Sequence, residues 1–484
     1  MPESLKILFV ASEAVPFAKT GGLADVAGSL PKALFRMGHD IRLAIPKYGA
    51  IEDKTWNMRS RGELSCGGTL KTCLLPGTSI TVMFTENEKY FGRWGFYGEN
   101  GADYPDNAER FLYFNNAVLS ACEKLDWIPD VIHCNDWQSS LVPLFLKLGR
   151  FPALETCATI VTIHNIAYQG YFEGSFMEKA ALPWELYTPE KLEYWNGFSF
   201  LKAGLLYGDL ITTVSEKYAA EILDNGEYGR GMEGVLRARQ QDLHGIINGI
   251  DYDQWNPLTD KYLVKNYNLE TIERKQANKR QVVLDLKLES GENTPLISMV
   301  SRLDEQKGLD ILIEAMDGLM KLDINLVLLG IGDRKFYPAL EALCEKYKGR
   351  LSVNLRFDNP LGHLLYGGSD MFLMPSHFEP CGLSQLISFK YGVIPVARST
   401  GGLYDTVANF NPRTGKGNGF TFGAYSPAAL LESVTRAVST YADKKAWSHL
   451  IRTAMTADFS WEKSARKYSD LYELAARRPR ERVV

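Results

Sequence analysis

Short apolar runs alternate with amphipathic stretches along most of the chain. Residues 5–11 and 41–46 have the pattern of buried strands, and the apolar periodicity of residues 26–37 predicts a helix between them. A strand, a helix and a strand in this order favour a parallel sheet. A second series begins with a strand at 296–300 and a helix at 309–320. The pattern therefore predicts an α/β protein with two doubly wound sheets.

The length of the chain points to more than one domain. A chain of 484 residues exceeds what a single hydrophobic core usually serves. We expect an N-terminal domain over residues 1–245 and a C-terminal domain over residues 246–460. Residues 461–484 form a terminal helix and tail, which we expect to pack back on the N-terminal domain.

The region between the first strands and residue 124 is less regular. Residues 73–75 and 80–84 suggest a hairpin around a Pro-Gly pair. Residues 90–98 are rich in aromatics and glycine, and we expect them to form a binding loop rather than a strand or a helix. Residues 107–124 regain the periodicity of a helix.

The composition is that of a globular protein without a basic surface. Hydrophobic residues make up 45% and charged residues 23%, and the net charge is -4 with a pI near 6.1. Nucleic-acid binders usually carry a basic field, so this balance argues against nucleic acid as a partner while leaving room for a local phosphate pocket. No apolar run approaches the roughly 18 residues of a membrane span, so we expect no membrane association.

The cysteines and the N-terminus favour a reducing compartment. The seven cysteines are scattered, odd in number and free of any C-x-x-C pair, which argues against a disulfide framework or a zinc ribbon. The first residues enter a strand-like run at once and lack the charged head and long apolar region of a signal peptide. We therefore expect a cytoplasmic protein. Nothing in the sequence indicates its oligomeric state.

A glycine-rich turn occurs twice, at Lys19–Asp25 and at Ser399–Asp405. Each turn follows an apolar run and precedes a helical pattern. This order places backbone N–H groups at a helix N-terminus, where they can bind an anion, and glycine lets a ligand approach the chain closely. The repetition suggests two similar lobes that face one ligand.

Two polar residues follow predicted strands in the first lobe. Asp136 comes after the strand at 131–134, and His164 comes after the strand at 159–163. Ligands of open α/β sheets gather at the carboxyl ends of strands. Asp136 could act as a base and His164 as a hydrogen-bond donor. A single histidine at a strand end is, however, more often a structural hydrogen-bonding residue.

The second lobe offers groups suited to phosphate and sugar. Arg302 and Lys307 follow the strand at 296–300, and both are charge-assisted donors for phosphate oxygens, although they could equally be surface ion pairs. Glu379 could accept from sugar hydroxyls, or it could only stabilise the start of the next helix. Cys381 has no His and Asn partnership and is interpreted as pocket lining.

Several other site types lack their patterns. The Walker phosphate loop and a G-x-G-x-x-G after a strand are both absent, which removes the main support for a kinase or a nicotinamide dehydrogenase. Asp251 and Asp253 have the D-x-D form of metal-dependent glycosyltransferases, but a turn is the better interpretation there. No ligand spacing demands a metal. We therefore expect neither a metal nor another cofactor.

With these residues in view, the chain resembles the bacterial glycogen synthase and plant starch synthase family. The resemblance runs in order through nearly the whole chain. The matching stretches are 19–25, 133–137, 162–165, 199–204, 228–234, 248–251, 301–308, 375–383, 399–407 and 458–461.

The resemblance implies two Rossmann-like lobes that face a cleft, the B-type glycosyltransferase fold. It implies that glucose passes from ADP-glucose to the non-reducing end of an α-1,4-glucan with retention of configuration, the glucan on the first lobe and the donor on the second. It implies catalytic roles for Asp136, His164 and Glu379. It implies that the donor contacts Lys19, Gly22, Asn165, Asn248, Arg302, Lys307, Phe357, Cys381, Gly382, Leu383, Thr400, Gly401 and Gly402.

The chain departs from the family pattern at two places. His377 stands where arginine is common, and Phe357 replaces a tyrosine in the segment that faces the nucleotide, which bears on the choice between ADP-glucose and UDP-glucose. A non-catalytic glucan-binding or priming protein is the alternative, but a binder would not need Lys19, Arg302 and Lys307 for a diphosphate. A glucan phosphorylase would need a lysine for pyridoxal phosphate, and no stretch suggests one.

Overall fold

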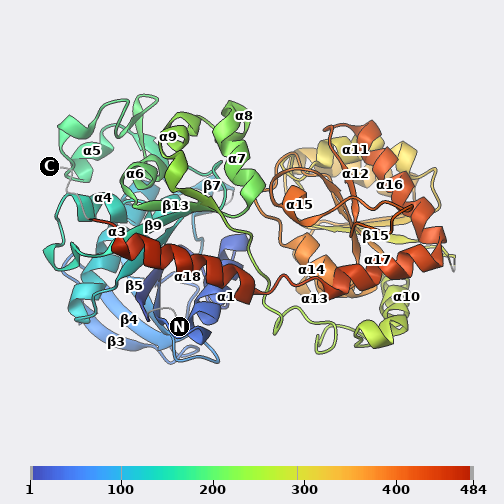
Figure 1. Ribbon diagram of the computed structural model, residues 1–484, viewed down its shortest axis with the longest axis horizontal. Coiled ribbons are helices and arrows are strands. Elements are labelled where there is room, and N and C mark those ends of the chain that lie inside the picture. Colours follow the sequence, from blue (N-terminus) through green and yellow to red (C-terminus); the bar gives the residue numbers. More distant parts are fainter. Residues whose placement is uncertain (1–3, 100, 292, 480–484) are drawn as a thin grey trace. The chain divides into compact units, whose positions relative to one another are not determined.

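The computed structural model describes residues 4–99, 101–291 and 293–479. The chain divides into two compact units. The first takes in the chain up to Gly249 together with the segment that starts at Trp461, and the second is Ile250–Ser460 (Figure 1).

The first unit is built on a nine-stranded sheet. Its strand order is β14-β13-β9-β8-β1-β2-β5-β4-β3, parallel from β14 to β5 and antiparallel at β4 and β3. Strands β1, β8 and β9 are buried apart from Lys6 at the start of β1, as expected for parallel strands covered on both faces. The bounds are β1 (Lys6–Val10), β2 (Asp40–Pro46), β3 (Arg59–Glu63), β4 (Thr69–Leu74), β5 (Thr81–Glu86), β8 (Val131–Asn135), β9 (Ala158–Ile163), β13 (Leu210–Thr213) and β14 (Leu243–Gly245).

Helices and two small sheets surround this sheet. The helices are α1 (Gly22–Arg36), α2 (Glu88–Phe91), α3 (Asn107–Lys124), α4 (Val142–Lys147), α5 (Phe176–Lys179), α6 (Phe200–Tyr207), α7 (Glu216–Asp224), α8 (Gly226–Gly229), α9 (Glu233–Ala238) and α18 (Trp461–Arg477). The small sheets contain β6 (Gly98–Glu99) with β7 (Ala102–Asp103), and β10 (Tyr171–Glu173), β12 (Gly197–Ser199) and β11 (Glu193–Tyr194).

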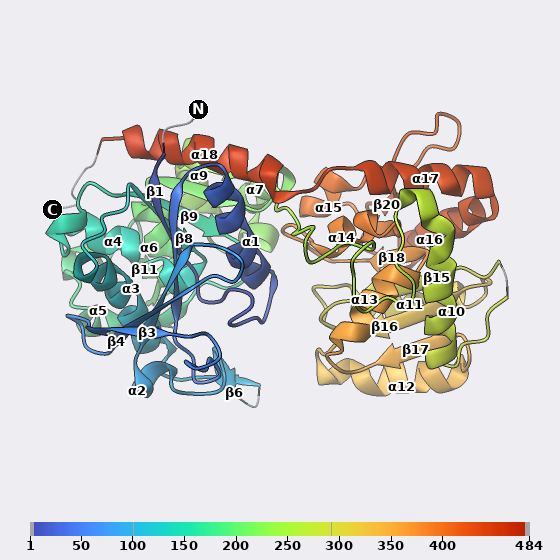
Figure 2. The same cartoon turned by 90° about the horizontal axis from the view of Figure 1, so that it is seen from below.

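Helix α18 belongs to the first unit although it is the last helix of the described chain. It packs beside α1 and over β8 and β9 (Figure 2). The hydroxyl of Tyr472 lies 2.7 Å from Nδ1 of the buried His133, and the hydroxyl of Ser469 lies 2.8 Å from Nε2 of His39. Tyr472 is fully buried. Helix α18 is therefore part of the core of this unit.

The second unit has a six-stranded, wholly parallel sheet. Its order is β17-β16-β15-β18-β19-β20. The strands are β15 (Leu296–Val300), β16 (Asn325–Leu329), β17 (Leu351–Asn354), β18 (Met371–Met374), β19 (Ile394–Arg398) and β20 (Phe420–Phe422). The helices are α10 (Lys275–Asp285), α11 (Leu309–Leu319), α12 (Tyr337–Lys346), α13 (Asn359–Gly368), α14 (Ser384–Lys390), α15 (Gly401–Thr406), α16 (Pro427–Ala442) and α17 (Lys444–Thr456).

Both sheets change their winding direction beside their first long strand. In the first unit the chain continues outward from β1 through β2 and returns to pair β8 on the other side. In the second unit β15 pairs with β16 on one side and with β18 on the other. Ligands of such sheets bind at the carboxyl ends of the strands beside this switch. The loops after β1, β8, β15 and β18 are therefore where a site is expected.

The structure corrects some sequence-based expectations. The aromatic segment 90–98 is not wholly a loop, because α2 extends into it and β6 begins at its end. Strands β3 and β14 were not predicted, since the first is exposed throughout and the second is only three residues long. The hairpin of β4 and β5 is confirmed, and helix α3 has the predicted bounds.

All seven cysteines are free thiols. No helix in the described part of the chain is both long and apolar enough to cross a membrane.

Candidate active site

Glu13 binds the first glycine turn from inside the protein. It follows β1 and is only 4% exposed. The backbone N–H groups of Thr20 and Gly21 donate to its Oε2, and the Thr20 hydroxyl donates to its Oε1 at 2.8 Å. The hydroxyl of Tyr97 donates to Oε1 at 3.1 Å. A carboxylate of the chain thus occupies the N–H groups that precede α1.

This arrangement corrects the prediction for Lys19–Asp25. The glycine turn is predicted to offer its N–H groups to an anion from a ligand. The N–H groups of Thr20 and Gly21 instead donate hydrogen bonds to Glu13. Lys19 Nζ lies 2.7 Å from Oδ1 of Asp25, and the Lys19 side chain is 42% exposed. Gly22 is the first residue of α1. The turn presents Lys19 to solvent together with Thr20, Gly21 and Gly22, which are also exposed.

Asp136 follows β8, where its main chain has a left-handed conformation with φ 54°. Its Oδ1 accepts the backbone N–H of His164 at 2.7 Å, so the two predicted catalytic residues of this unit lie together. Loss of solvation raises the pKa of Asp136 to about 7; the N–H groups of His164 and Asn165 act against this rise, and Glu13 adds to it. The carboxyl group therefore titrates near neutral pH, which suits proton transfer.

His164 is neutral and oriented by a neighbouring amide. Its Nε2 lies 2.9 Å from Oδ1 of Asn135, whose amide group donates to the carbonyls of Val10 and His133. Burial lowers the pKa of His164 to about 3. The single hydrogen of the neutral ring is thus bonded to Asn135, and Nδ1 is left as an acceptor. The predicted role of His164 as a donor does not fit this arrangement.

Asn165 and Asn248 have different surroundings in the first unit. Oδ1 of Asn165 accepts the N–H of Ala167 at 3.1 Å and so shapes its own loop. Asn248 follows β14 and is 5% exposed, and its Oδ1 has no hydrogen-bond partner among the described residues. A buried carbonyl oxygen without a donor is costly. Asn248 is therefore suited to accept a hydrogen bond from a ligand.

In the second unit Lys307 and Glu379 form a close ion pair. Lys307 Nζ lies 2.6 Å from Oε2 of Glu379, and the hydroxyl of Ser376 donates to the same oxygen at 3.0 Å. Glu379 is 5% exposed. Its Oε1 receives no hydrogen bond from the described residues. The structure thus brings together two predicted site residues from the loops after β15 and β18.

Arg302 and Phe357 are more exposed. Arg302 NH1 lies 3.3 Å from Asp304, and NH2 donates to Gln306 at 3.1 Å, so the guanidinium group is held near its own loop with 49% of the side chain exposed. Phe357 follows β17 and is 79% exposed. An exposed ring of this kind offers a face on which a flat group can stack.

The second glycine turn packs directly against the Glu379 loop. The N–H of Gly402 donates to the carbonyls of Glu379 and Pro380, and the N–H of Thr400 donates to Arg398. A Cβ atom on Gly401 would lie 2.0 Å from the carbonyl of Glu379, and one on Gly402 would lie 2.0 Å from that of Cys381. These glycines therefore permit contact between two backbone segments. The N–H groups of Thr400 and Gly402 are occupied, contrary to their predicted use for a phosphate.

Two N–H groups of the Glu379 loop do remain available. Neither Gly382 nor Leu383 donates its backbone N–H to an acceptor in the described part of the chain. Cys381 beside them is buried. Gly382 has φ 72°, a conformation that favours glycine. The loop thus offers donors beside the free Oε1 of Glu379.

Sequence reasoning missed three groups of this region. Glu13, Tyr97 and Ser376 each hydrogen-bond to a predicted site residue or turn. The sequence did contain a signal for Glu13. It is a charged residue just past a buried strand, which is the same criterion that singled out Asp136.

Within the described residues, the segments that could bind a metal do not form a metal site. Asp251 accepts the N–H of Asp253 at 2.9 Å, which confirms the turn in the D-x-D segment. No group of three His, Cys, Asp or Glu residues within the described ranges could hold a metal ion.

Comparisons with known proteins agree on one family. Residues 6–238 match the family model described as starch synthase catalytic domain, and residues 284–452 match glycosyl transferases group 1. A glycogen synthase of Geotalea daltonii is 45% identical over 97% of this chain and 99% of its own length. One from Moorella thermoacetica is 44% identical over 99% of both. The chain belongs to the glycogen synthase family.

Solved structures agree with this membership. The catalytic domain of starch synthase IV from Arabidopsis thaliana, bound to ADP and acarbose, has a TM-score of 0.89 and 32% identity, covering 98% of this chain and 100% of that one. Sucrose-phosphate synthase from Thermosynechococcus elongatus has a TM-score of 0.61 and 17% identity, covering 97% of this chain and 98% of that one. At this identity the likeness is one of fold alone. The predicted B-type glycosyltransferase fold and the glucosyltransferase class of this enzyme are thereby confirmed.

Proposed function

We propose that the enzyme transfers glucose from ADP-glucose to the non-reducing end of an α-1,4-glucan with retention of configuration. In this proposal the second unit binds the donor and the first unit binds the glucan. Family membership supports the reaction class. We further propose a cytoplasmic location, as expected for an enzyme that acts on a stored glucan.

The proposal rests mainly on Glu379. This carboxylate is buried, its Oε2 is bonded to Lys307 and Ser376, and its Oε1 is left without a donor. The Oε1 atom of this largely buried carboxylate can accept a hydrogen bond from a ligand hydroxyl. The free N–H groups of Gly382 and Leu383 lie in the same loop. Acceptor and donors side by side suit a sugar that carries hydroxyls next to a phosphate.

The chemistry requires a leaving diphosphate to be stabilised. The bond between C1 of glucose and the diphosphate oxygen breaks, and a bond forms from C1 to the 4-hydroxyl oxygen of the acceptor on the same face. The acceptor proton passes to the departing diphosphate. Lys307 and Arg302 of the second unit would stabilise the negative charge that develops on the diphosphate. Oε1 of Glu379 would position the transferred glucose.

Asp136, His164 and Asn248 would act on the transferred glucose and the acceptor. Asp136 has a carboxyl group that titrates near neutral pH. His164 presents Nδ1, and Asn248 presents an unpartnered carbonyl oxygen; both would accept hydrogen bonds from sugar hydroxyls. These roles need no net change of protonation during the transfer.

ADP-glucose is preferred to UDP-glucose as the donor in this proposal. The starch synthase IV structure carries ADP. Phe357 is exposed beside the carboxyl end of β17 and would stack on the base. A purine offers the larger ring face, so stacking on an aromatic side chain favours it over a pyrimidine.

A glucose-transfer assay tests the proposal. Purified enzyme is given glycogen with either ADP-glucose or UDP-glucose, and labelled polymer is counted. We expect transfer with ADP-glucose and much less with UDP-glucose. Glu379→Gln should lower the rate with the fold intact, whereas Glu432→Gln, in an exposed ion pair of α16, should not. No transfer from either donor would overturn the proposed function.

A further inference from the structure

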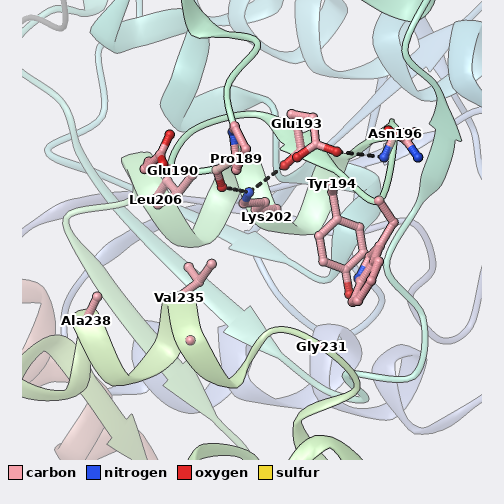
Figure 3. Close-up of a pocket in the computed structure, with 12 residues that line it drawn as sticks. Pro189, Glu190, Glu193, Tyr194, Asn196, Lys202, Leu206, Gly231, Val235 and Ala238 are labelled. Carbon is pink, nitrogen blue, oxygen red and sulfur yellow. Dashed lines mark hydrogen bonds between the residues drawn. The ribbon is translucent and has the colours of Figure 1, made fainter.

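Buried side-chain donors in both units hold carbonyl groups of a neighbouring segment. In the first unit the ammonium group of Lys202 donates to the carbonyls of Pro189 and Glu193 at 2.6 and 2.5 Å, beside a pocket of about 610 Å³ (Figure 3). In the second unit the side-chain amide of Gln385 donates to the carbonyls of Cys381 and Gly382 at 3.0 and 2.8 Å. The contacts of Gln385 concern the loop that carries Glu379, so they bear on the reaction.

Gln385 connects this loop to the second glycine turn. It is the second residue of α14 and is fully buried. Its Nε2 also lies 3.2 Å from the hydroxyl oxygen of Thr406, and that hydroxyl donates to the carbonyl of Gly402 at 2.6 Å. A chain of hydrogen bonds therefore runs from the Glu379 loop through Gln385 and Thr406 to Gly402.

The two carbonyls that Gln385 holds determine where two N–H groups point. The carbonyl of Cys381 and the N–H of Gly382 belong to one peptide group, and the carbonyl of Gly382 and the N–H of Leu383 belong to the next. Both peptide bonds are trans, so the C=O and N–H bonds of each point in opposite directions. Because both carbonyls face Gln385, both N–H groups face away from it. These are the two donors that the loop leaves available.

The main chain at these residues suits an anion. Gly382 has φ 72°, and Leu383 has φ -103° and ψ -27°. Successive residues of opposite handedness direct their N–H groups into one concavity, which can bind an anion. A Cβ atom on Gly382 would lie 2.4 Å from Oε1 of Gln385. Glycine therefore permits both this conformation and the close approach of the amide.

The amide of Gln385 is kept although it is not fully satisfied. Its Oε1 is buried and has no hydrogen-bond partner among the described residues. A buried amide oxygen without a donor lowers stability, and an apolar side chain of similar volume would avoid that cost. The polar residue is therefore better explained by what its donors do to the loop than by packing.

We propose that Gln385, supported by Thr406, is a positioning residue for glucosyl transfer that directs the N–H groups of Gly382 and Leu383 toward the diphosphate of the donor. The identity of this ligand rests on the proposed function. Donors held in place before the reaction stabilise the charge that develops on the leaving group without reorganising. The second glycine turn then acts on the phosphate indirectly, because it braces this loop through Thr406 and through the N–H of Gly402.

Three variants test the positioning role. Gln385→Met keeps the length of the side chain and removes the amide. Thr406→Val removes the hydroxyl that links the amide to the glycine turn, and Thr406→Ser restores it. Circular dichroism checks folding, and the two Thr406 variants carry the test if Gln385→Met does not fold.

Two matched controls make the same chemical changes outside the site. Gln281→Met removes an amide that donates to Asp285 in α10 at 2.8 Å. Thr435→Val removes a hydroxyl that donates to the carbonyl of Leu431, four residues earlier in α16, at 2.7 Å. Both should behave as the wild type does.

Calorimetric titration with ADP and with adenosine separates the phosphate contact from the base. Gln385→Met should bind ADP about tenfold more weakly than the wild type, as for loss of a hydrogen bond to a charged group, and adenosine equally well. Its kcat for transfer from ADP-glucose to glycogen should fall by about 10², the cost of a misplaced group, with KM for glycogen unchanged. Thr406→Val should change the ADP affinity and kcat in the same direction by a smaller factor, and Thr406→Ser should restore both. A defect of folding alone would lower the active fraction without changing the Kd for ADP.

Several results would overturn the positioning role of Gln385. These are unchanged ADP affinity and kcat in folded Gln385→Met, an equal loss of adenosine binding, a Thr406→Ser variant that matches Thr406→Val, or an equal loss in either control. Failure of the proposed function is distinguishable from these, because it would appear in the wild type as no ADP binding and no transfer.

Discussion

The ammonium group of Lys307 lies 2.6 Å from Oε2 of Glu379, and the pair joins the loop after β15 to the loop after β18. The side chain of Glu379 is 7% exposed and that of Lys307 is 19% exposed, so the pair is largely shielded from water. It fixes one oxygen of the carboxylate and leaves the other for a ligand. A single contact thus positions both a cation for phosphate and an acceptor for sugar.

Replacing Lys307 by alanine should damage both catalysis and stability. Loss of the cation should lower turnover with the donor by about 10²–10³, the usual cost of one electrostatic stabiliser, with little effect on glycogen binding. It also leaves Glu379 buried without its partner, which should reduce the free energy of unfolding by about 2 kcal/mol, less than for a fully buried pair. Steady-state kinetics and urea unfolding measure the two effects.

The control for this variant is Lys335→Ala. Lys335 pairs with Glu305 at 2.9 Å on the surface, with half of its side chain exposed, so its loss should leave the free energy of unfolding nearly unchanged. Turnover of Lys307→Ala within a factor of two of the wild type would remove Lys307 from the proposed diphosphate site.

Asp136 should make stability depend on pH in the neutral range. Its pKa is about 7 in the folded protein against 3.8 for the free side chain. Between these values the folded state holds a proton that the unfolded state has lost, so the stabilising contribution is complete below pH 4 and is lost as the pH rises to 7. The full difference amounts to about 4 kcal/mol. Asp136→Asn should therefore gain stability relative to the wild type between pH 4 and 7.

Urea unfolding of the wild type and Asp136→Asn at pH 5 and pH 8 measures this difference. The amide can keep the hydrogen bond from the His164 N–H, so the comparison isolates the charge. If the free energy of unfolding changes equally in the two proteins between pH 5 and pH 8, Asp136 does not titrate in this range in the folded protein. That result would contradict the raised pKa.

Glu13→Gln should loosen the first glycine turn and shift the titration of Asp136. The carboxylate accepts hydrogen bonds from Thr20, Gly21 and Tyr97. Bonds to a charged acceptor are worth about 1.5–3 kcal/mol each, and a neutral amide keeps only part of this. Because Glu13 raises the pKa of Asp136, removal of its charge should lower that pKa.

Two measurements follow Glu13→Gln. Hydrogen exchange of the backbone amides of residues 20 and 21 should become faster than in the wild type, and the pH midpoint of the Asp136-dependent stability change should move down. Glu52→Gln, which alters an exposed carboxylate bonded to Thr55, should do neither. Slow exchange retained in Glu13→Gln would show that the turn is rigid without the carboxylate.

Phe357→Ala should raise KM for ADP-glucose with little change in stability. The ring is 79% exposed, so its removal should change the free energy of unfolding by less than about 0.5 kcal/mol. Loss of one stacked base costs about 1–3 kcal/mol, which corresponds to a rise in KM of roughly five- to 150-fold if KM reports binding. Phe357→Tyr keeps the ring and serves as the control. An unchanged KM in Phe357→Ala would place the base elsewhere.

The sequence was sufficient for features that depend on neighbouring residues. The helix at 107–124 has its predicted bounds because its apolar residues keep one period throughout. The polar residues after β8 and β9 lie at the strand ends because buried parallel strands read as short apolar runs. The placing of Asp136 beside His164 follows from these two facts, since adjacent parallel strands end at the same edge.

The sequence was insufficient where the partner comes from a distant segment. The N–H groups at Thr20 and Gly402 look free in sequence, yet Glu13 and the Glu379 carbonyl occupy them. The ring hydrogen of His164 is bound to Asn135, which depends on how the amide of Asn135 is held by Val10 and His133. Such contacts depend on side-chain placement in the assembled fold, which no local pattern records.

Helix α18 also affects the order in which this protein can complete its folding during synthesis. The first unit begins the chain, but its core includes Tyr472 and its bond to His133, which are made only after the whole of Ile250–Ser460 has been translated. Domains fold on the ribosome as their sequence emerges. The second unit can therefore fold while the first still has an open apolar face over β8 and β9. The part of the enzyme that is synthesised first is the part that is finished last.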